Sequence, residues 1–165
     1  MNSHNKNIVC MGEAMVEFTR VEDQKGEALY IRGLGGDTSN CAISAARQGA
    51  DVAYLSSVGN DQFGNVAMDI WSKEGIDVSH ISVNPESPTG IYFIEPAPEG
   101  RNFTYYRKGS AASKMTLTND ARALLSGEVI LHLSAISQAI SATAKELSFD
   151  AIDLVKASTA LFVAV

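Results

Sequence analysis

Residues 33–49 read GLGGDTSNCAISAARQG and place a glycine-rich turn, a polar cluster and a helix of small residues in immediate succession. Glycines in the turn allow backbone angles and close approaches that a β-carbon would forbid. The helix predicted over residues 41–47 can pack close to a sheet because its side chains are small, and so it can hold the turn rigidly. The pattern favours a ligand-contacting loop; an ordinary strand-to-helix connection is the alternative.

The glycine spacing argues against a nucleotide-binding loop in this segment. It is not G-x-G-x-x-G, and no G-x-x-x-x-G-K-[ST] occurs in the chain. The first predicted strand, residues 7–10, leads into GEAMVEF rather than into the glycine fingerprint of a dinucleotide fold. A stand-alone dinucleotide-binding protein is therefore not expected.

Strand and helix patterns alternate along most of the chain. Strands are predicted at residues 7–10, 51–57, 77–83, 128–134 and 161–165, and helices at 41–47, 61–74, 118–125 and 141–157. Such alternation is typical of an α/β fold with a parallel sheet and helices on both faces. Asp61 stands at the start of the second helix, where an aspartate accepts hydrogen bonds from free N–H groups, so a helix cap is favoured over a catalytic acid.

A second group of β-rich segments does not fit this alternation. These segments cover residues 12–18, 28–32, 90–96 and 101–108, and the last two are joined by APEG, which indicates a hairpin. We therefore expect a second, smaller sheet built from segments near residues 12–34 and 89–110.

Composition argues against several classes of function, namely nucleic-acid binding, membrane insertion and metal binding. The 165 residues are 45% hydrophobic and 19% charged, and the net charge of −6 disfavours nonspecific nucleic-acid binding. Residues 1–7 lack an apolar signal core, and no apolar run approaches the ~20 residues needed to span a bilayer, so we expect a cytoplasmic protein without a membrane partner. Cys10 and Cys41 are too few for a disulfide framework and lack metal-site spacing, so we expect two reduced thiols and no metal site.

Three blocks follow one another in the order seen in ribokinase-like sugar kinases, the PfkB carbohydrate kinase family. They are IVCMGEAMVEF at residues 8–18, GLGGDTSN at 33–40 and LSSVGNDQFGNVAMDIWSKEGID at 55–77. They resemble the family's first strand, its glycine-glycine-x-x-x-asparagine substrate loop and its V-G-x-D-x-F-G signature. A fourth block, FTYYRKGSAAS at residues 103–113, is most similar to the 2-keto-3-deoxygluconate kinase branch.

The resemblance implies a ribokinase-like parallel sheet flanked by helices, with a small β-lid that covers the sugar. In the family this lid often clasps a second copy, so a homodimer is expected; a monomer with its lid folded onto its own domain is the alternative. The resemblance also implies transfer of the ATP γ-phosphoryl group to a sugar hydroxyl, with Mg²⁺.

The resemblance also implies that about half of a kinase is present here, since family members run to roughly 300 residues, an ordinary domain size for this class. The last residues, ALFVAV at 160–165, are typical of a buried strand with no helix after it to cover the sheet. The catalytic base and the anion hole are therefore expected in a C-terminal half that is absent. This chain alone is expected to be inactive, and no catalytic residue is assigned in it.

Side chains in the β-rich segments match a sugar acid, which has hydroxyls, a carboxylate and an apolar face. Arg107 is the natural carboxylate clamp because its planar fork donates two parallel hydrogen bonds. Tyr105 faces the same way on a strand, whereas Tyr106 faces the opposite side and is expected to pack into the lid. Tyr92 could bring its hydroxyl to the same pocket or simply pack. The whole predicted substrate-binding set is Glu17, Gly35, Gly36, Asp37, Asn40, Tyr92, Tyr105, Arg107 and Ile136.

Two carboxylates near the start of the chain need separate roles. Glu17 sits where the resembling kinases place an acidic residue against the sugar, and it could accept hydrogen bonds from two hydroxyls. Glu13 points the same way on a strand, which invites a glycosidase or metal site, but the motif holds no His or further acid. We therefore predict that Glu17 faces the ligand and that Glu13 is solvated. Ser110 could line the pocket entrance or cap the next segment.

Together these features predict the sugar-binding half of an ATP-dependent kinase that acts on 2-keto-3-deoxygluconate. A fructokinase or ribokinase of the same family is one alternative, and a non-catalytic sugar-binding fragment is another. Fructose and ribose are uncharged and offer Arg107 no carboxylate to bind. A requirement for Arg107 therefore distinguishes the sugar acid from these two sugars.

Overall fold

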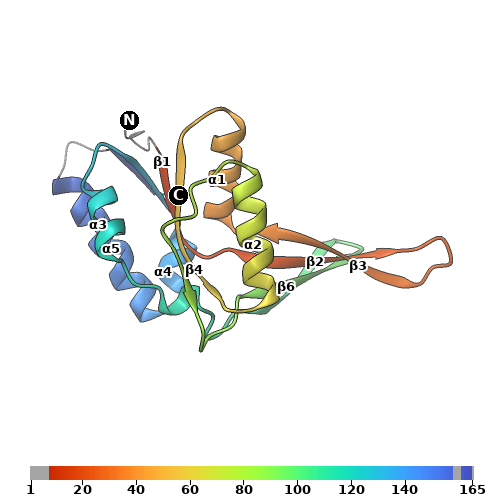
Figure 1. Ribbon diagram of the computed structural model, residues 1–165. Helices are drawn as coiled ribbons and strands as arrows, with labels where there is room; N and C mark the ends of the chain where they lie inside the picture. The colour runs from red at the N-terminus through yellow and green to blue at the C-terminus, as the bar shows by residue number, and fades with distance from the viewer. Residues whose placement is uncertain (1–7, 158–160, 165) are drawn as a thin grey trace.

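The main sheet consists of parallel strands with helices on both faces (Figure 1). The computed structural model describes residues 8–157 and 161–164. In this part of the chain the sheet has five strands in the order β5-β4-β1-β8-β9, namely β1 (Ile8–Met11), β4 (Val52–Gly59), β5 (Ile81–Asn84), β8 (Ile130–Leu133) and β9 (Leu161–Ala164). The helices are α1 (Asp37–Arg47), α2 (Gln62–Lys73), α3 (Asn119–Leu125), the short α4 (Ala135–Ala139), α5 (Ala142–Ala157) and a 3₁₀ turn, η1 (Ala112–Lys114). The predicted α/β fold with a parallel sheet flanked by helices is confirmed.

Both faces of the central strands β1 and β4 are buried, and alternate residues of a strand contribute to opposite faces. In β1, Val9 and Met11 join the apolar cluster under α3 and α5, whereas Cys10 joins the cluster under α1 and α2. On the second face Trp71 is fully buried, and its indole Nε1 donates a hydrogen bond to Ser39 Oγ at 2.9 Å. This contact ties the first turn of α1 to α2.

Helix α2 begins directly after Asp61, whose carboxylate caps it. Oδ1 accepts hydrogen bonds from the backbone N–H groups of Phe63 (3.0 Å) and Gly64 (2.8 Å), and Oδ2 accepts one from that of Thr89 (2.8 Å). Burial alone would raise the pKa of Asp61, but these hydrogen bonds outweigh it and hold the pKa below its ordinary value. The predicted helix cap is confirmed.

Replacing Asp61 with alanine should lower the free energy of unfolding by about 1–2 kcal/mol at neutral pH, because the N–H groups that it caps lose their acceptor. The folded-state pKa is lowered, so this stability is present above the unfolded pKa of about 4 and is lost as the pH falls through the folded-state value. Urea unfolding at neutral and at strongly acidic pH measures both effects. Asp69→Ala, at an exposed position of the same helix, is the control; equal losses in the two variants would contradict the prediction.

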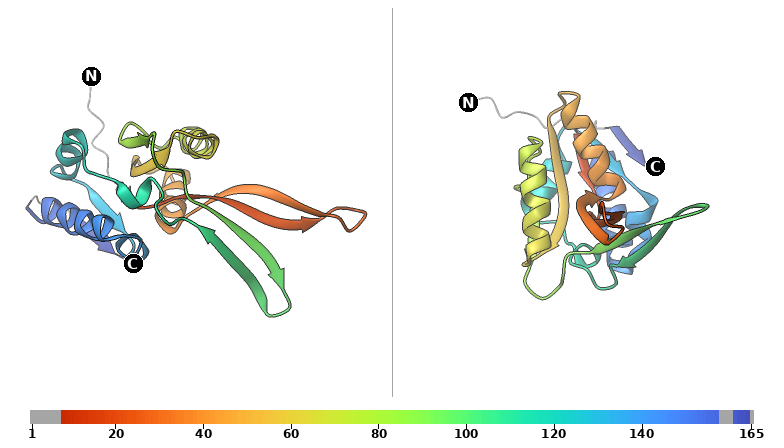
Figure 2. Two further views of the ribbon diagram at one scale, coloured as in Figure 1. Left: turned by 90° about the horizontal axis from the view of Figure 1, so that it is seen from below. Right: turned by 90° about the vertical axis from the view of Figure 1, so that its right-hand side faces the viewer.

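The second sheet holds four strands in the order β3-β2-β6-β7, and it projects away from the helices of the main sheet (Figures 1 and 2). Its strands are β2 (Met15–Glu22), β3 (Ala28–Gly35), β6 (Ile91–Ala97) and β7 (Gly100–Tyr106). β2 pairs with β3, and β6 with β7, as antiparallel hairpins. The hairpins are joined by parallel pairing of β2 with β6 over Val16–Thr19, and beyond this region they diverge (Figure 2).

The glycine-rich segment differs locally from its prediction. Residues 33–35 are not a turn but the end of β3, and α1 begins at Asp37 rather than at Cys41. The whole change of direction is made at Gly36, which has a φ of 118°. A single glycine is sufficient because this conformation, which side chains disfavour, turns the chain within one residue.

Two further elements also differ from the sequence interpretation. Only Ile81–Asn84 forms the strand expected over residues 77–83, and Asp77 adds a single bridge to Ala53. Helix α4 (Ala135–Ala139) was not predicted, because five residues are too few to show a helical period.

Candidate active site

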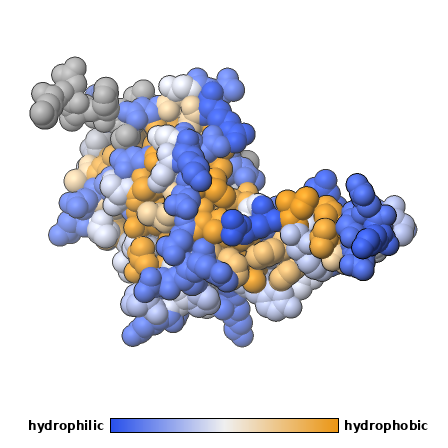
Figure 3. Space-filling model, turned by 45° about the vertical axis from the view of Figure 1, so that its right-hand side comes forward, coloured by the Kyte–Doolittle hydropathy of each residue, from blue (hydrophilic) through white to orange (hydrophobic). Residues whose placement is uncertain are grey.

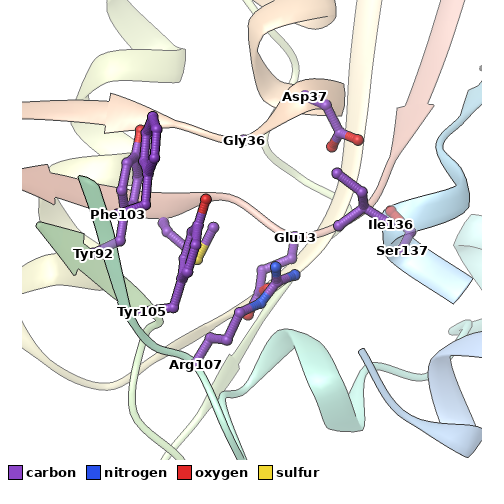
Figure 4. A pocket seen from close by; sticks show the side chains of 10 residues that line it. Glu13, Gly36, Asp37, Tyr92, Phe103, Tyr105, Arg107, Ile136 and Ser137 are labelled. Atoms are coloured by element: carbon purple, nitrogen blue, oxygen red, sulfur yellow. The ribbon is translucent and has the colours of Figure 1, made fainter. Parts of the chain in front are cut away.

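A cavity of about 160 Å³ lies where the second sheet meets the carboxyl ends of β1 and β8 (Figure 4). Ligand sites of α/β proteins commonly lie outside the carboxyl ends of parallel strands. Residues of the second sheet, of the segments that follow β1, β3 and β7, and of the starts of two helices line the cavity: Glu13, Met15, Gly36, Asp37, Tyr92, Phe103, Tyr105, Arg107, Ile136 and Ser137. This cavity is the candidate active site.

Glu13 lies in the link between β1 and β2, and hydrogen bonds and close packing hold the backbone of this link in place. The carbonyl oxygen of Gly12 accepts hydrogen bonds from the Tyr54 hydroxyl (3.2 Å) and from Ser56 Oγ (2.8 Å), both on β4. A β-carbon on Gly12 would lie 2.5 Å from Thr38 Oγ1, so the link also packs tightly against α1. The position of Glu13 is therefore set by the main sheet rather than by a loose loop.

Glu13 is buried, with 3% of its surface exposed, and it contacts two partners that follow β7. Its Oε1 accepts a hydrogen bond from Ser110 Oγ at 2.5 Å, and its Oε2 forms an ion pair with Arg107 Nη2. Burial raises the pKa of Glu13, and the Ser110 hydrogen bond and the Arg107 charge oppose this only in part. The Arg107 side chain keeps 25% exposure and points along the cavity (Figure 4).

Aromatic rings form an apolar wall opposite Asp37 (Figure 4). The ring centroids of Tyr92 and Tyr105 are 5.6 Å apart and those of Phe103 and Tyr105 are 6.1 Å apart, in stacked arrangements. Stacked rings of this kind offer a flat apolar surface with hydroxyl groups at its edge. Such a wall suits a ligand with one apolar face and several hydroxyls.

Asp37 joins the starts of α1 and α4 across the end of the main sheet. Its Oδ1 accepts a hydrogen bond from the backbone N–H of Thr38 at 2.7 Å, and its Oδ2 accepts one from the Ser134 hydroxyl. Ser134 Oγ in turn accepts a hydrogen bond from the backbone N–H of Ile136 at 3.1 Å. This chain of contacts places Ile136 beside the cavity.

Glu17 and Gly35 support Tyr92 and do not line the cavity. The Glu17 carboxylate accepts hydrogen bonds from the Tyr92 hydroxyl and from Thr19 Oγ1, the latter at 2.7 Å. Burial and the Glu17 carboxylate raise the pKa of Tyr92. A β-carbon on Gly35 would overlap the Tyr92 hydroxyl, so a glycine is needed there. The side chain of Asn40 is exposed on α1 and does not line the cavity either.

The remaining predicted residues do meet at the cavity: Gly36, Asp37, Tyr92, Tyr105, Arg107 and Ile136. The prediction that Glu13 is solvated is wrong, because the residues after β7 fold over it and pair with its carboxylate. Met15, Phe103 and Ser137 were missed. Phe103 shares the two-residue spacing of Tyr105 and Arg107, which could have identified it, whereas Ser137 lies on the unpredicted α4.

Metal-ligating groups are not concentrated at this site. Within residues 8–157 and 161–164, no group of three or more His, Cys, Asp or Glu side chains could hold a metal ion. Among the helices that the structure describes, none combines the length and the apolar character needed to cross a bilayer. Cys10 and Cys41 carry free thiols, and burial raises the pKa of Cys10.

Comparisons with known proteins agree with this architecture. The chain is 36% identical over 147 residues to the 2-dehydro-3-deoxygluconokinase of Bacillus subtilis (strain 168), covering 87% of this chain and 45% of that protein. It is 32% identical over 143 residues to the protein of the same name from Thermoproteus tenax, covering 84% of this chain and 44% of the relative. The chain thus spans less than half the length of these curated relatives.

A solved structure shares the fold. The fructokinase of Xylella fastidiosa with bound ATP matches with a TM-score of 0.86 at 22% identity, over 97% of this chain and 51% of that one. The family described as pfkB family carbohydrate kinase matches residues 5–164. Because this match covers almost the whole chain, the chain belongs to the PfkB family of carbohydrate kinases.

Proposed function

We propose that the chain forms the sugar-binding part of an ATP-dependent kinase that acts on 2-dehydro-3-deoxygluconate, also called 2-keto-3-deoxygluconate. The observation that carries this proposal is the partly exposed guanidinium of Arg107 in a cavity with an aromatic wall. A guanidinium pairs with a carboxylate through parallel hydrogen bonds, which a neutral sugar could not use. The names of the two relatives above support the same substrate.

Each part of such a sugar acid has a suitable group in the cavity. In this proposal Arg107 binds the carboxylate, Asp37 accepts a hydrogen bond from a hydroxyl, and the rings of Tyr92 and Tyr105 pack on the apolar face. Ile136 packs from the opposite side, and the backbone of Gly36 lines the cavity beside Asp37.

The other predicted residues receive indirect or outer roles in this proposal. Glu17 and Gly35 orient the Tyr92 hydroxyl, as their contacts suggest. Asn40, exposed on the first turns of α1, is retained as a candidate contact for a hydroxyl at the outer end of the sugar.

In the proposed reaction the γ-phosphoryl group passes from ATP to a sugar hydroxyl, the hydroxyl proton is released, and ADP leaves. Positioning of the acceptor and electrostatic stabilisation supply most of the catalysis in phosphoryl transfer. The described residues contribute the first of these. We assign no residue of this chain to Mg²⁺ or to ATP.

A fructokinase or ribokinase activity is the second candidate. The observation that favours it is the ion pair between Glu13 and Arg107, which already neutralises the cation that a sugar acid would need. The third candidate is a non-catalytic sugar-binding fragment, which would bind its sugar without turnover.

The test combines calorimetry with a coupled ADP-release assay on 2-keto-3-deoxygluconate, fructose and ribose. This chain is compared with a version extended at its C-terminus by the corresponding part of the Bacillus subtilis relative. We expect both to bind the sugar acid best and only the extended version to release ADP. Turnover by this chain alone would refute the predicted inactivity, and preference for fructose or ribose would refute the acidic substrate.

We further propose that the second sheet is a lid through which two copies pair. The strand register places Leu29, Ile31, Phe103 and Tyr105 on one face of this sheet, where they are 48–60% exposed. Apolar side chains also gather visibly along the projecting sheet (Figure 3). A face of this kind is stabilised when a second copy covers it.

Sedimentation of Ile31→Asp tests the pairing. We expect the wild-type chain to sediment as a dimer and Ile31→Asp as a monomer, because a buried carboxylate on the apolar face opposes pairing. Thr104→Asp, exposed on the opposite face of the same sheet, is the matched control and should remain dimeric. A monomeric wild-type chain would refute the proposal.

A further inference from the structure

Glu13 is an acidic group that the proposed sugar chemistry leaves without a task. It lines the cavity and is 3% exposed, and it forms its ion pair with the residue that is proposed to bind the substrate carboxylate. A β-carbon on Gly90 would lie 3.0 Å from Glu13 Oε1, so the protein packs closely on this side as well. The carboxylate therefore has little room to turn away from Arg107.

The charged groups around Glu13 give the site a negative balance. Arg107 carries the positive charge, whereas Glu13 and Asp37 are acidic, and Asp37 interacts unfavourably with Glu13. Burial raises the pKa of Tyr54 and of Tyr92, so these phenols are neutral at physiological pH. The Tyr105 hydroxyl also lines the cavity, and Lys108 lies on a neighbouring cavity that shares Arg107.

A sugar carboxylate that binds Arg107 would thus enter a site whose cation is already neutralised by Glu13. Two carboxylates that share one cation cannot both remain charged without a large cost. The Arg107 Nε is also buried, and no described residue accepts a hydrogen bond from it.

We propose, building on the proposed function, that Glu13 takes up a proton from solvent when the carboxylate of a sugar acid binds Arg107. The proton forms an O–H bond on Glu13, and no bond of the sugar changes. Ser110 suits both states, because its hydroxyl donates to the ionised carboxylate and can accept from the protonated one. Glu13 is then a specificity-determining residue that links the binding of acidic, but not neutral, sugars to pH.

Burial raises the pKa of Glu13 in the free protein and so makes this proton uptake easier. Below the pKa of free Glu13 the proton is already present and affinity does not depend on pH. Above it the proton must be taken from solvent, so the affinity for the sugar acid falls by up to about tenfold per pH unit.

Calorimetry in two buffers with different enthalpies of ionisation counts the protons taken up on binding. We expect the wild-type chain to take up close to one proton with 2-keto-3-deoxygluconate at a pH above the titration midpoint of Glu13 in the free protein, and none with fructose. Glu13→Gln, which preserves the shape of the side chain, should take up none and should bind the sugar acid with an affinity independent of pH. Equal uptake in both proteins, or no uptake in the wild type, would overturn the proposal.

A titration without sugar keeps the inference testable if neither sugar binds. The Glu13 carboxyl resonance is followed by carbon NMR in the wild type, Arg107→Gln and Ser110→Ala. We expect its midpoint to move to higher pH in both variants, because each loses a group that favours the ionised form. An unchanged midpoint in Arg107→Gln would overturn the coupling, whereas failure of both sugars to bind would count against the proposed function alone.

Discussion

Replacing Arg107 with glutamine is expected to lower the affinity for 2-keto-3-deoxygluconate by roughly 100-fold and to destabilise the fold at the same time. Affinity falls because the substitution removes the charged, paired hydrogen bonds between Arg107 and the sugar carboxylate. Removing such an interaction typically costs about 2–5 kcal/mol. The loss of stability has another cause. Glu13 stays buried without its cation, and removing one partner of a buried ion pair leaves an unpaired charge that costs about 3 kcal/mol or more.

The two effects can be separated by pH and by a second substitution. Without Arg107 the folded-state pKa of Glu13 lies further above its unfolded value, so the variant should be most stable at low pH and lose stability as the pH rises through the folded-state value. Glu13→Gln combined with Arg107→Gln removes the stranded charge, so it should regain stability but not affinity for the sugar acid. Urea unfolding and calorimetry measure these outcomes. Full affinity in either variant would show that Arg107 is not the carboxylate clamp.

Replacing Gly36 with alanine is expected to lower the free energy of unfolding by about 3 kcal/mol or more. The residue has a φ of 118°, which costs a side chain roughly 1–2 kcal/mol. In addition, its new β-carbon would lie 2.6 Å from the carbonyl oxygen of Glu13 and 2.9 Å from Cα of Ala14. Forcing these backbone groups apart adds about 1–3 kcal/mol and moves Glu13 and Asp37 relative to each other.

Gly49→Ala provides the matched control for this strain. Gly49 also has a positive φ, 88°, but a β-carbon there would meet nothing within 4 Å. It should therefore show the conformational cost alone, about 1 kcal/mol. Urea unfolding of both variants gives the difference. If Gly36→Ala were no less stable than Gly49→Ala, the tight approach between the β1–β2 link and the start of α1 would be refuted.

Much of the fold was accessible from local patterns because those patterns report on burial and backbone geometry. The strand predicted at residues 51–57 is present as β4 (Val52–Gly59), which is buried throughout. Asp61 caps α2 as predicted, and Gly75, which follows that helix, has the positive φ of a helix stop. The predicted boundaries of α1 and β5 were wrong. These boundaries depend on pairing with distant strands, which a local sequence pattern does not report.

The candidate site was only partly accessible for the same reason. The alternation expected along residues 101–108 was sufficient to place Tyr105 and Arg107 on one side, and both residues line the cavity. Asp37 and Gly36 were recognisable from their residue types. Glu17 was predicted to face the ligand, but its nearest partner is the hydroxyl of Tyr92, brought beside it by the parallel pairing of β2 with β6.

The sequence alone determined the alternation of strands and helices and the residue types of the proposed sugar-acid site, because these depend on contacts between near neighbours. It also determined the family, because its motif blocks resemble those of PfkB kinases. Only the tertiary structure decided what surrounds Glu13. Ser110 lies 97 residues further along the chain and its hydroxyl reaches Glu13 at 2.5 Å, and Arg107 pairs with the same carboxylate. Whether a carboxylate is solvated or buried depends on which distant segments cover it, and that is settled when the two sheets meet at the cavity.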